Sequence, residues 1–190
     1  TDTVPVREAA TAGMLVATAA ALAVSIRRRA DGPTALPRWL DLPAPLIGLV
    51  GLVAAGIDAG GPDLLAVARI VVGAAFLGSI TDAMLLGHWY LVQPGLSRAP
   101  LRELLQLDTW TWFPEVALLL VPTGMVSVLN GTIDDGYGGM LGWFWIASAV
   151  TTIVLLFVTK AALKEQQYAA VMAATGLLYL AILTAAGTDL

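Results

Sequence analysis

The stretch DLLAVARIVVGAAFLGSITDAMLLGHWYLVQP, residues 63 to 94, decides how this chain is interpreted. It is apolar enough to cross a membrane as a helix, yet it contains Arg69, Asp82 and His88, the one histidine of the sequence. A charge inside a membrane segment costs several kcal/mol, about 2.5–3.5 on insertion scales, unless it is paired or reached by water. That cost makes these side chains the first candidates for function.

Composition places the whole chain among membrane proteins. Hydrophobic residues make up 58% of the sequence and charged residues 13%, against about 45–50% and about 25% in soluble domains. Its apolar stretches of about 20 residues have the length that crosses a bilayer as a helix. We therefore predict an all-α, polytopic helical bundle, with residues 1–190 forming a single integral membrane domain.

The apolar stretches predict six transmembrane spans. They cover about residues 9–26, 40–59, 64–92, 113–129, 140–159 and 168–186. Between the third and fourth spans, residues 97–112 mix leucines with charged side chains, which predicts a short amphipathic helix on the membrane surface. Pro114 fits the first turn of the fourth span, and Pro122 is expected to bend that span.

The basic residues indicate the orientation. The segments after spans one, three and five hold Arg27, Arg28, Arg29, Arg38, Arg98, Arg102, Lys160 and Lys164. The positive-inside rule places these segments in the cytoplasm and both termini outside. The basic cluster follows the first apolar run and does not precede it, which favours a retained helix over a signal peptide. We predict a multi-pass protein of a bacterial inner (plasma) membrane.

Several kinds of site are excluded by residue counts. The sequence has no cysteine, so disulfides, thiolate metal sites and iron–sulfur clusters cannot form. One histidine cannot supply a haem held by two histidines or a zinc site that needs several. We expect no metal site, no catalytic group and no cofactor held by this chain alone. The absence of a basic nucleic-acid patch or phosphate loop predicts no nucleic-acid partner.

Two acids are candidates for a proton relay, Asp82 and Glu115. Asp82 lies about ten residues, or about 15 Å, from the C-terminal end of the third span, deeper than the other acids. A carboxyl at such a depth can exchange a proton, or it can simply hydrogen-bond Ser79 or another helix. Glu115 should lie at a similar depth on the next span, where it could equally well stabilise the start of a helix.

Four aromatic side chains form a candidate ligand site: His88, Trp89, Tyr90 and Trp112. Such a cluster can hydrogen-bond a quinone carbonyl or a lipid phosphate while its rings pack on an apolar body. If the third and fourth spans are antiparallel neighbours, the cluster and the two acids could line one pocket open to the cytoplasm. The alternative is an ordinary belt of interfacial aromatic residues.

Three functions fit these features. The first is a subunit of a larger membrane complex, for example in electron transport, with membrane lipids and other membrane subunits as partners and a quinone or lipid in the pocket. The second is a small proton-coupled transporter that uses Asp82. The third is a membrane-embedded lipid-modifying enzyme, although one histidine and two acids on uncertain neighbours suit it less well. The sequence favours a protein that is not catalytic on its own.

Overall fold

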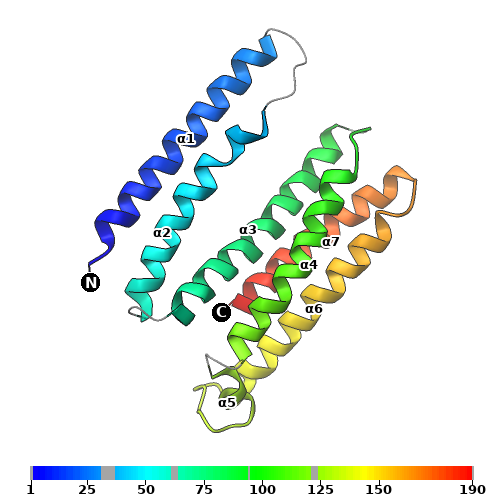
Figure 1. The fold of residues 1–190 in the computed structure, drawn as a ribbon. Helices are drawn as coiled ribbons and strands as arrows, with labels where there is room; N and C mark the ends of the chain where they lie inside the picture. Colours follow the sequence, from blue (N-terminus) through cyan, green and yellow to red (C-terminus); the bar gives the residue numbers. More distant parts are fainter. Residues whose placement is uncertain (1, 31–36, 61–63, 94, 121–123, 190) are drawn as a thin grey trace. The chain divides into compact units, whose positions relative to one another are not determined.

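The computed structural model describes residues 2–30, 37–60, 64–93, 95–120 and 124–189 (Figure 1). Every regular element within these ranges is a helix, which confirms the all-α prediction. In chain order the elements are α1 (Val4–Ala30), the 3-10 helix η1 (Arg38–Asp41), α2 (Pro43–Gly60), α3 (Leu64–Val92), α4 (Ala99–Leu120), α5 (Met125–Leu129), α6 (Met140–Ala162) and α7 (Tyr168–Asp189).

Five helical segments are long and apolar enough to cross a membrane. They are Val4–Arg28, Trp39–Ala59, Leu64–Val92, Met140–Ala162 and Tyr168–Asp189. They correspond to the predicted first, second, third, fifth and sixth spans, and α3 has the bounds predicted for the third. The chain is therefore a multi-pass membrane protein by the length and composition of its helices.

The predicted boundary between a surface helix at 97–112 and a span at 113–129 is wrong. The structure has one helix there, α4, which continues through Pro114 and ends at Leu120. Proline inside a helix removes a backbone hydrogen bond and costs about 3 kcal/mol. The same helix face is buried on both sides of Pro114, and this packing offsets the cost. Pro122 lies outside the described residues.

The first compact unit comprises Thr1–Val71. Here α1 and α2 run side by side (Figure 1), and small residues let them approach closely. A methyl group added at Gly48 would lie 2.9 Å from the Met14 sulfur, and one at Gly51 would lie 3.0 Å from the Ala10 methyl group. Glycine at these positions therefore sets the spacing of the pair.

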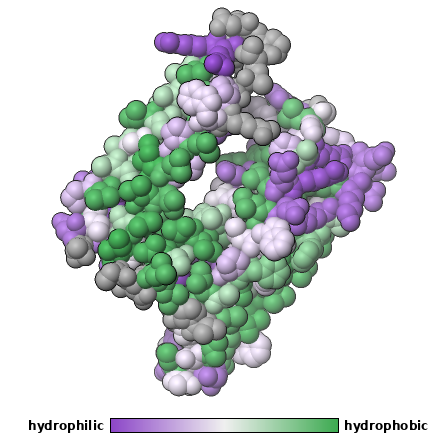
Figure 2. Space-filling model, viewed as in Figure 1, coloured by the Kyte–Doolittle hydropathy of each residue, from purple (hydrophilic) through white to green (hydrophobic). Residues whose placement is uncertain are grey.

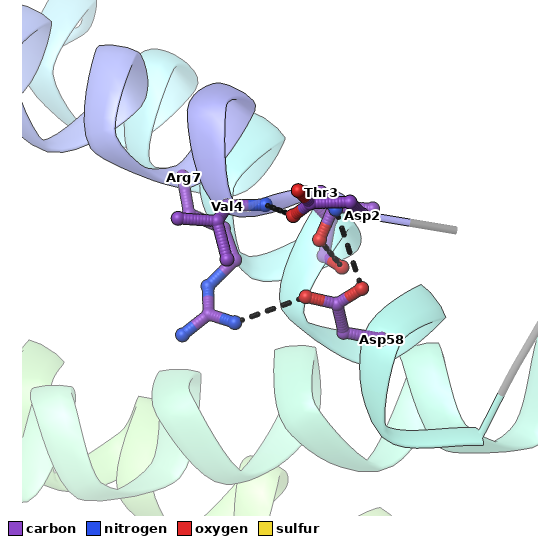
Figure 3. A network of polar contacts seen from close by, with 6 residues as sticks. Asp2, Thr3, Val4, Arg7 and Asp58 are labelled. Carbon is purple, nitrogen blue, oxygen red and sulfur yellow. Dashed lines mark hydrogen bonds and ion pairs between the residues drawn. The ribbon is translucent and has the colours of Figure 1, made fainter.

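A polar clasp joins the start of α1 to the end of α2 (Figure 3). The Arg7 guanidinium pairs with the Asp58 carboxylate at 3.1 Å. The Thr3 hydroxyl donates to the Ala54 carbonyl oxygen at 2.9 Å, and the Thr3 amide donates to Asp58 at 3.4 Å. Exposed ion pairs contribute about 0–1 kcal/mol, so the clasp mainly fixes where the N-terminal segment lies.

The second compact unit, Val72–Leu190, contains most of α3 together with α4, α5, α6 and α7. Its core is formed by buried side chains from α3, α4, α6 and α7 and from the residue that follows α6: Phe76, Ile80, Ala83, Tyr90, Leu101, Leu105, Leu156, Leu163, Val171, Ala174, Leu178, Ala181 and Ala185. Hydrogen bonds to backbone carbonyl oxygens cross between helices, because a polar group in this setting needs a partner. Thr175 of α7 donates to Gly87 of α3 at 2.9 Å, and Trp112 of α4 donates to Ala149 of α6 at 3.1 Å.

One end of this unit is strongly polar. Arg102 donates to the Leu163 carbonyl oxygen at 2.9 Å, and Arg98 donates to those of Glu165 and Gln166. Guanidinium groups at a helix C-terminus satisfy free carbonyls and complement the helix dipole. Figure 2 shows a cluster of hydrophilic residues at this end, where α4 begins and α6 gives way to α7.

Candidate functional site

Asp108 of α4 is the most unusual polar residue of the second unit. Its exposed fraction is 0%. Among the residues that the structure describes, neither of its carboxyl oxygens has a hydrogen-bond partner. Buried polar groups are almost always hydrogen-bonded, because an unsatisfied one costs about 1–3 kcal/mol. A carboxyl kept in such a place at this cost is a strong candidate for function.

Asp108 lies on a buried seam that follows α4. Successive buried residues of α4 are three, four or seven positions apart, which is the spacing of one helix face. They are Leu101, Leu105, Asp108, Glu115 and Leu119. Trp112, half-buried, occupies the same seam between the two acids. Asp108 and Glu115 are therefore about 10 Å apart along the helix axis, on nearly the same face.

Three polar groups from other helices act on the Asp108 carboxyl. They are the Ser79 hydroxyl and the Asp82 carboxyl from α3 and the Lys160 ammonium from α6. Ser79 donates its own proton to the Phe76 carbonyl oxygen at 3.1 Å. The Lys160 ammonium donates a hydrogen bond to the hydroxyl of Thr109 at 2.7 Å. Thr109 is the residue that follows Asp108 in the sequence.

Glu115 is 2% exposed and lies near a second acid. A methyl group added at Gly73 of α3 would lie 2.8 Å from Asp189 Oδ1 and 3.6 Å from Glu115 Oε2. Both carboxyl groups thus pack against the bare backbone of Gly73. Asp189 ends α7 and is exposed. Glu115 is therefore the buried member of a pair whose other member reaches the surface.

Asp82, the acid expected to lie deepest, is exposed on α3. The buried face of α3 carries Gly73, Phe76, Ser79, Ile80, Ala83, Gly87 and Tyr90. Asp82 falls between these positions and points away from the core that they form. It is still near enough to act electrostatically on Asp108. Its role in a proton relay stays a prediction.

The structure does not gather the four predicted ligand-binding residues around one point. Tyr90 is buried and its hydroxyl donates to the Ser97 carbonyl oxygen at 2.6 Å. His88 is exposed, with its Nδ1 3.2 Å from the Tyr179 hydroxyl. Trp89 is 50% exposed, and Trp112 donates to α6 as described above. Their binding of a quinone or lipid stays a prediction.

Two site residues were missed from the sequence. Asp108 was assigned to a surface helix, and Lys160 to a loop. The signal for Asp108 was its place in the series Leu101, Leu105, Asp108, whose spacing of four and three marks one helix face. Within the described ranges, no group of three or more His, Cys, Asp or Glu side chains is arranged to hold a metal ion.

Comparison with known proteins gives no relative from which a function could be carried over. No family model matches the sequence, no curated protein matches it, and no solved structure matches the fold.

Proposed function

We propose that this protein carries protons across the membrane through the core of its second unit, with Asp108 as the central proton-exchanging group. The observation that carries the proposal is the complete burial of this carboxyl without a hydrogen bond from the described residues. An ionised carboxylate in a membrane interior is costly unless it is paired or wet. Asp108 must therefore stay protonated, or a cation must move next to its carboxylate each time it releases its proton.

The surroundings of Asp108 suit a carboxyl that alternates between two states. The Ser79 hydroxyl bonds the Phe76 carbonyl oxygen at 3.1 Å, and a hydroxyl can either donate to an ionised carboxyl or accept from a protonated one. The ammonium of Lys160 is close enough to act on the ionised form. A site with an acceptor for one state and a cation for the other lowers the cost of passing between them.

Glu115 and Asp189 extend the path beyond Asp108. Asp189 is exposed and Glu115 is buried beside it, so together they can pass a proton between the core and the surface. The step of about 10 Å from Asp108 to Glu115 is much longer than a hydrogen bond. It requires water between them or a movement of α4 at Trp112. This requirement favours a gated carrier over an open channel.

The proposal includes α4 as a sixth span. Its 22 residues are about 33 Å long at 1.5 Å per residue, enough for a hydrocarbon core of about 30 Å. It carries Arg102, Glu103, Asp108 and Glu115, and it is not among the five segments that are apolar enough to cross a membrane by composition alone. With six spans the positive-inside rule places both termini outside and Asp189 at the extracytoplasmic face.

Single cysteines test this topology, because the chain has none of its own. Gln93 precedes α4 and Asp134 follows it, and both are exposed. If α4 crosses the membrane, a membrane-impermeant maleimide added outside intact cells labels Asp134→Cys and leaves Gln93→Cys unlabelled until the cells are opened. Labelling of both from one side would contradict a crossing by α4.

Proton uptake into liposomes tests the function. Purified protein is reconstituted with a pH-sensitive dye inside, and a potassium diffusion potential drives protons inward. We expect uptake above that of empty liposomes, lost in Asp108→Asn and kept in Glu103→Gln. Glu103 is an exposed acid on the same helix and is a matched control. The absence of uptake by the wild-type protein would overturn the proposal.

The other functions stay predictions from the sequence alone. The contacts of the described residues favour neither a subunit of an electron-transfer complex nor a lipid-modifying enzyme.

A further inference from the structure

Lys160 of α6 lies beside α4, the helix that carries the buried acid Asp108. It lies two residues before the end of α6 and is half-buried. Its Nζ donates to the Thr109 hydroxyl at 2.7 Å and lies 5.8 Å from the centre of the Phe157 ring. These contacts hold the ammonium beside α4, one residue along the chain from Asp108.

The hydroxyl of Thr109 is free to accept a hydrogen bond from the ammonium, because its own proton is donated elsewhere. Thr109 donates its own proton to the Leu105 carbonyl oxygen at 2.8 Å and accepts from Lys160. An ammonium has three protons to donate, and the flexible four-carbon stem of lysine lets it reorient at little cost. A short movement would bring it from Thr109 to the neighbouring carboxyl.

We propose that Lys160 is the internal counter-ion that exchanges with the proton on Asp108. When Asp108 releases its proton, the Lys160 ammonium leaves Thr109 and pairs with the carboxylate. When a proton returns to the carboxylate, the ammonium moves back to Thr109. Lys160 keeps its three protons throughout, so the charge of the pair alternates between +1 and 0 as one proton leaves and returns. Lys160 is thus a positioning residue for the proposed proton transfer, and the inference rests on proton exchange at Asp108.

Few other charged groups face Asp108. From α3 the charged neighbour is Asp82, a second acid. On α4 itself, Arg102 is bound to the Leu163 carbonyl oxygen and Glu103 is exposed. On α7 the sequence has one charged residue, Asp189, which ends the helix. Lys160 is therefore the cation placed to balance Asp108.

Infrared titration in lipid tests the inference without any measurement of transport. The absorption of protonated carboxyl groups is followed against pH in the full chain, and the band lost in Asp108→Asn is assigned to this residue. We expect Lys160→Met to move the midpoint of that band to higher pH by about 1 unit or more, because pairing of the ammonium with the carboxylate, as proposed, would favour the ionised form by an amount of this size. Lys160→Arg keeps the charge and is expected to keep most of the wild-type midpoint.

A second variant allows the inference to be tested even if the loss of the lysine charge prevents folding. Thr109→Val removes the resting acceptor and leaves both charges in place. The ammonium then spends more time at Asp108, so we expect the midpoint to move to lower pH, opposite to the effect of Lys160→Met.

The outcomes separate the inference from the proposed function. An unchanged midpoint in Lys160→Met and Thr109→Val would overturn the counter-ion role even if protons are transported. The lack of any titrating band that depends on Asp108 would overturn it as well. The two opposite shifts, found in a protein that takes up no protons in liposomes, would support the counter-ion role and overturn transport as the function.

Discussion

Replacing Asp108 with leucine should stabilise the fold while it abolishes function. Leucine has the same branching as aspartate, with two methyl groups in place of the carboxyl oxygens that lack hydrogen bonds. Removing an unsatisfied buried polar group recovers about 1–3 kcal/mol. The methyl groups are larger than the oxygens, and overpacking takes back part of the gain. Because lipid is as apolar as leucine, burial adds little more.

We therefore expect a net gain of about 1–2 kcal/mol in the free energy of unfolding. This corresponds to about a 5- to 30-fold change in the ratio of folded to unfolded protein. The gain would be measured by unfolding in mixed micelles, followed by tryptophan fluorescence. Glu103→Gln, on the exposed face of the same helix, should change the stability by less than about 0.5 kcal/mol.

The reasoning is refuted if Asp108→Leu destabilises the protein by more than about 1 kcal/mol. That result would mean that the carboxyl has a partner on which the fold depends, and that its burial is structural. A stabilised variant that still transports protons would place the exchanging group elsewhere.

Three further predictions concern the surroundings of the site. Gly73→Ala should change the free energy of unfolding by less than about 1 kcal/mol, because the new methyl group would lie 2.8 Å from Asp189 Oδ1 but this oxygen ends an exposed side chain that can rotate away; a larger loss in detergent unfolding would mean that Asp189 is held in place. Trp145→Phe removes the 2.8 Å hydrogen bond to the Thr188 carbonyl oxygen and should cost about 0.5–1.5 kcal/mol, with faster amide exchange at the end of α7 as the check. Backbone amides at and before the start of α6 donate to the Asp135 carboxylate and hold its pKa below the ordinary value of 3.8. The stability that this carboxylate contributes is therefore complete above pH 3.8 and is lost as the pH falls through the lowered pKa. Asp135→Asn should lower the stability at neutral pH and make the stability less dependent on pH in acid.

The membrane class, the all-helical fold and the bounds of α3 could be predicted from the sequence, because apolar runs of spanning length are strong local signals. The extent of α4 could not. Its charges between Arg98 and Asp108 suggested a surface helix, and Pro114 suggested a helix start. Only the packing partners reveal that one face stays buried through the proline.

Asp82 shows why depth along a helix does not give burial. Apolar residues lie on every side of α3, so its sequence does not say which face meets the core. The interhelix contacts bury Ser79 and Ala83 and leave Asp82 exposed. The buried acids Asp108 and Glu115 lie on α4, which is not among the helices apolar enough to cross a membrane by composition alone.

The most direct test of the central claim is the initial rate of proton uptake by liposomes that contain Asp108→Asn, relative to wild type at equal protein content and equal imposed potential. Loss of a positioned proton-transfer group typically costs about 10²-fold or more, so the account predicts a rate near that of empty liposomes, with Glu103→Gln close to wild type. A rate for Asp108→Asn within about twofold of wild type, too small a change for the loss of such a group, would contradict the account.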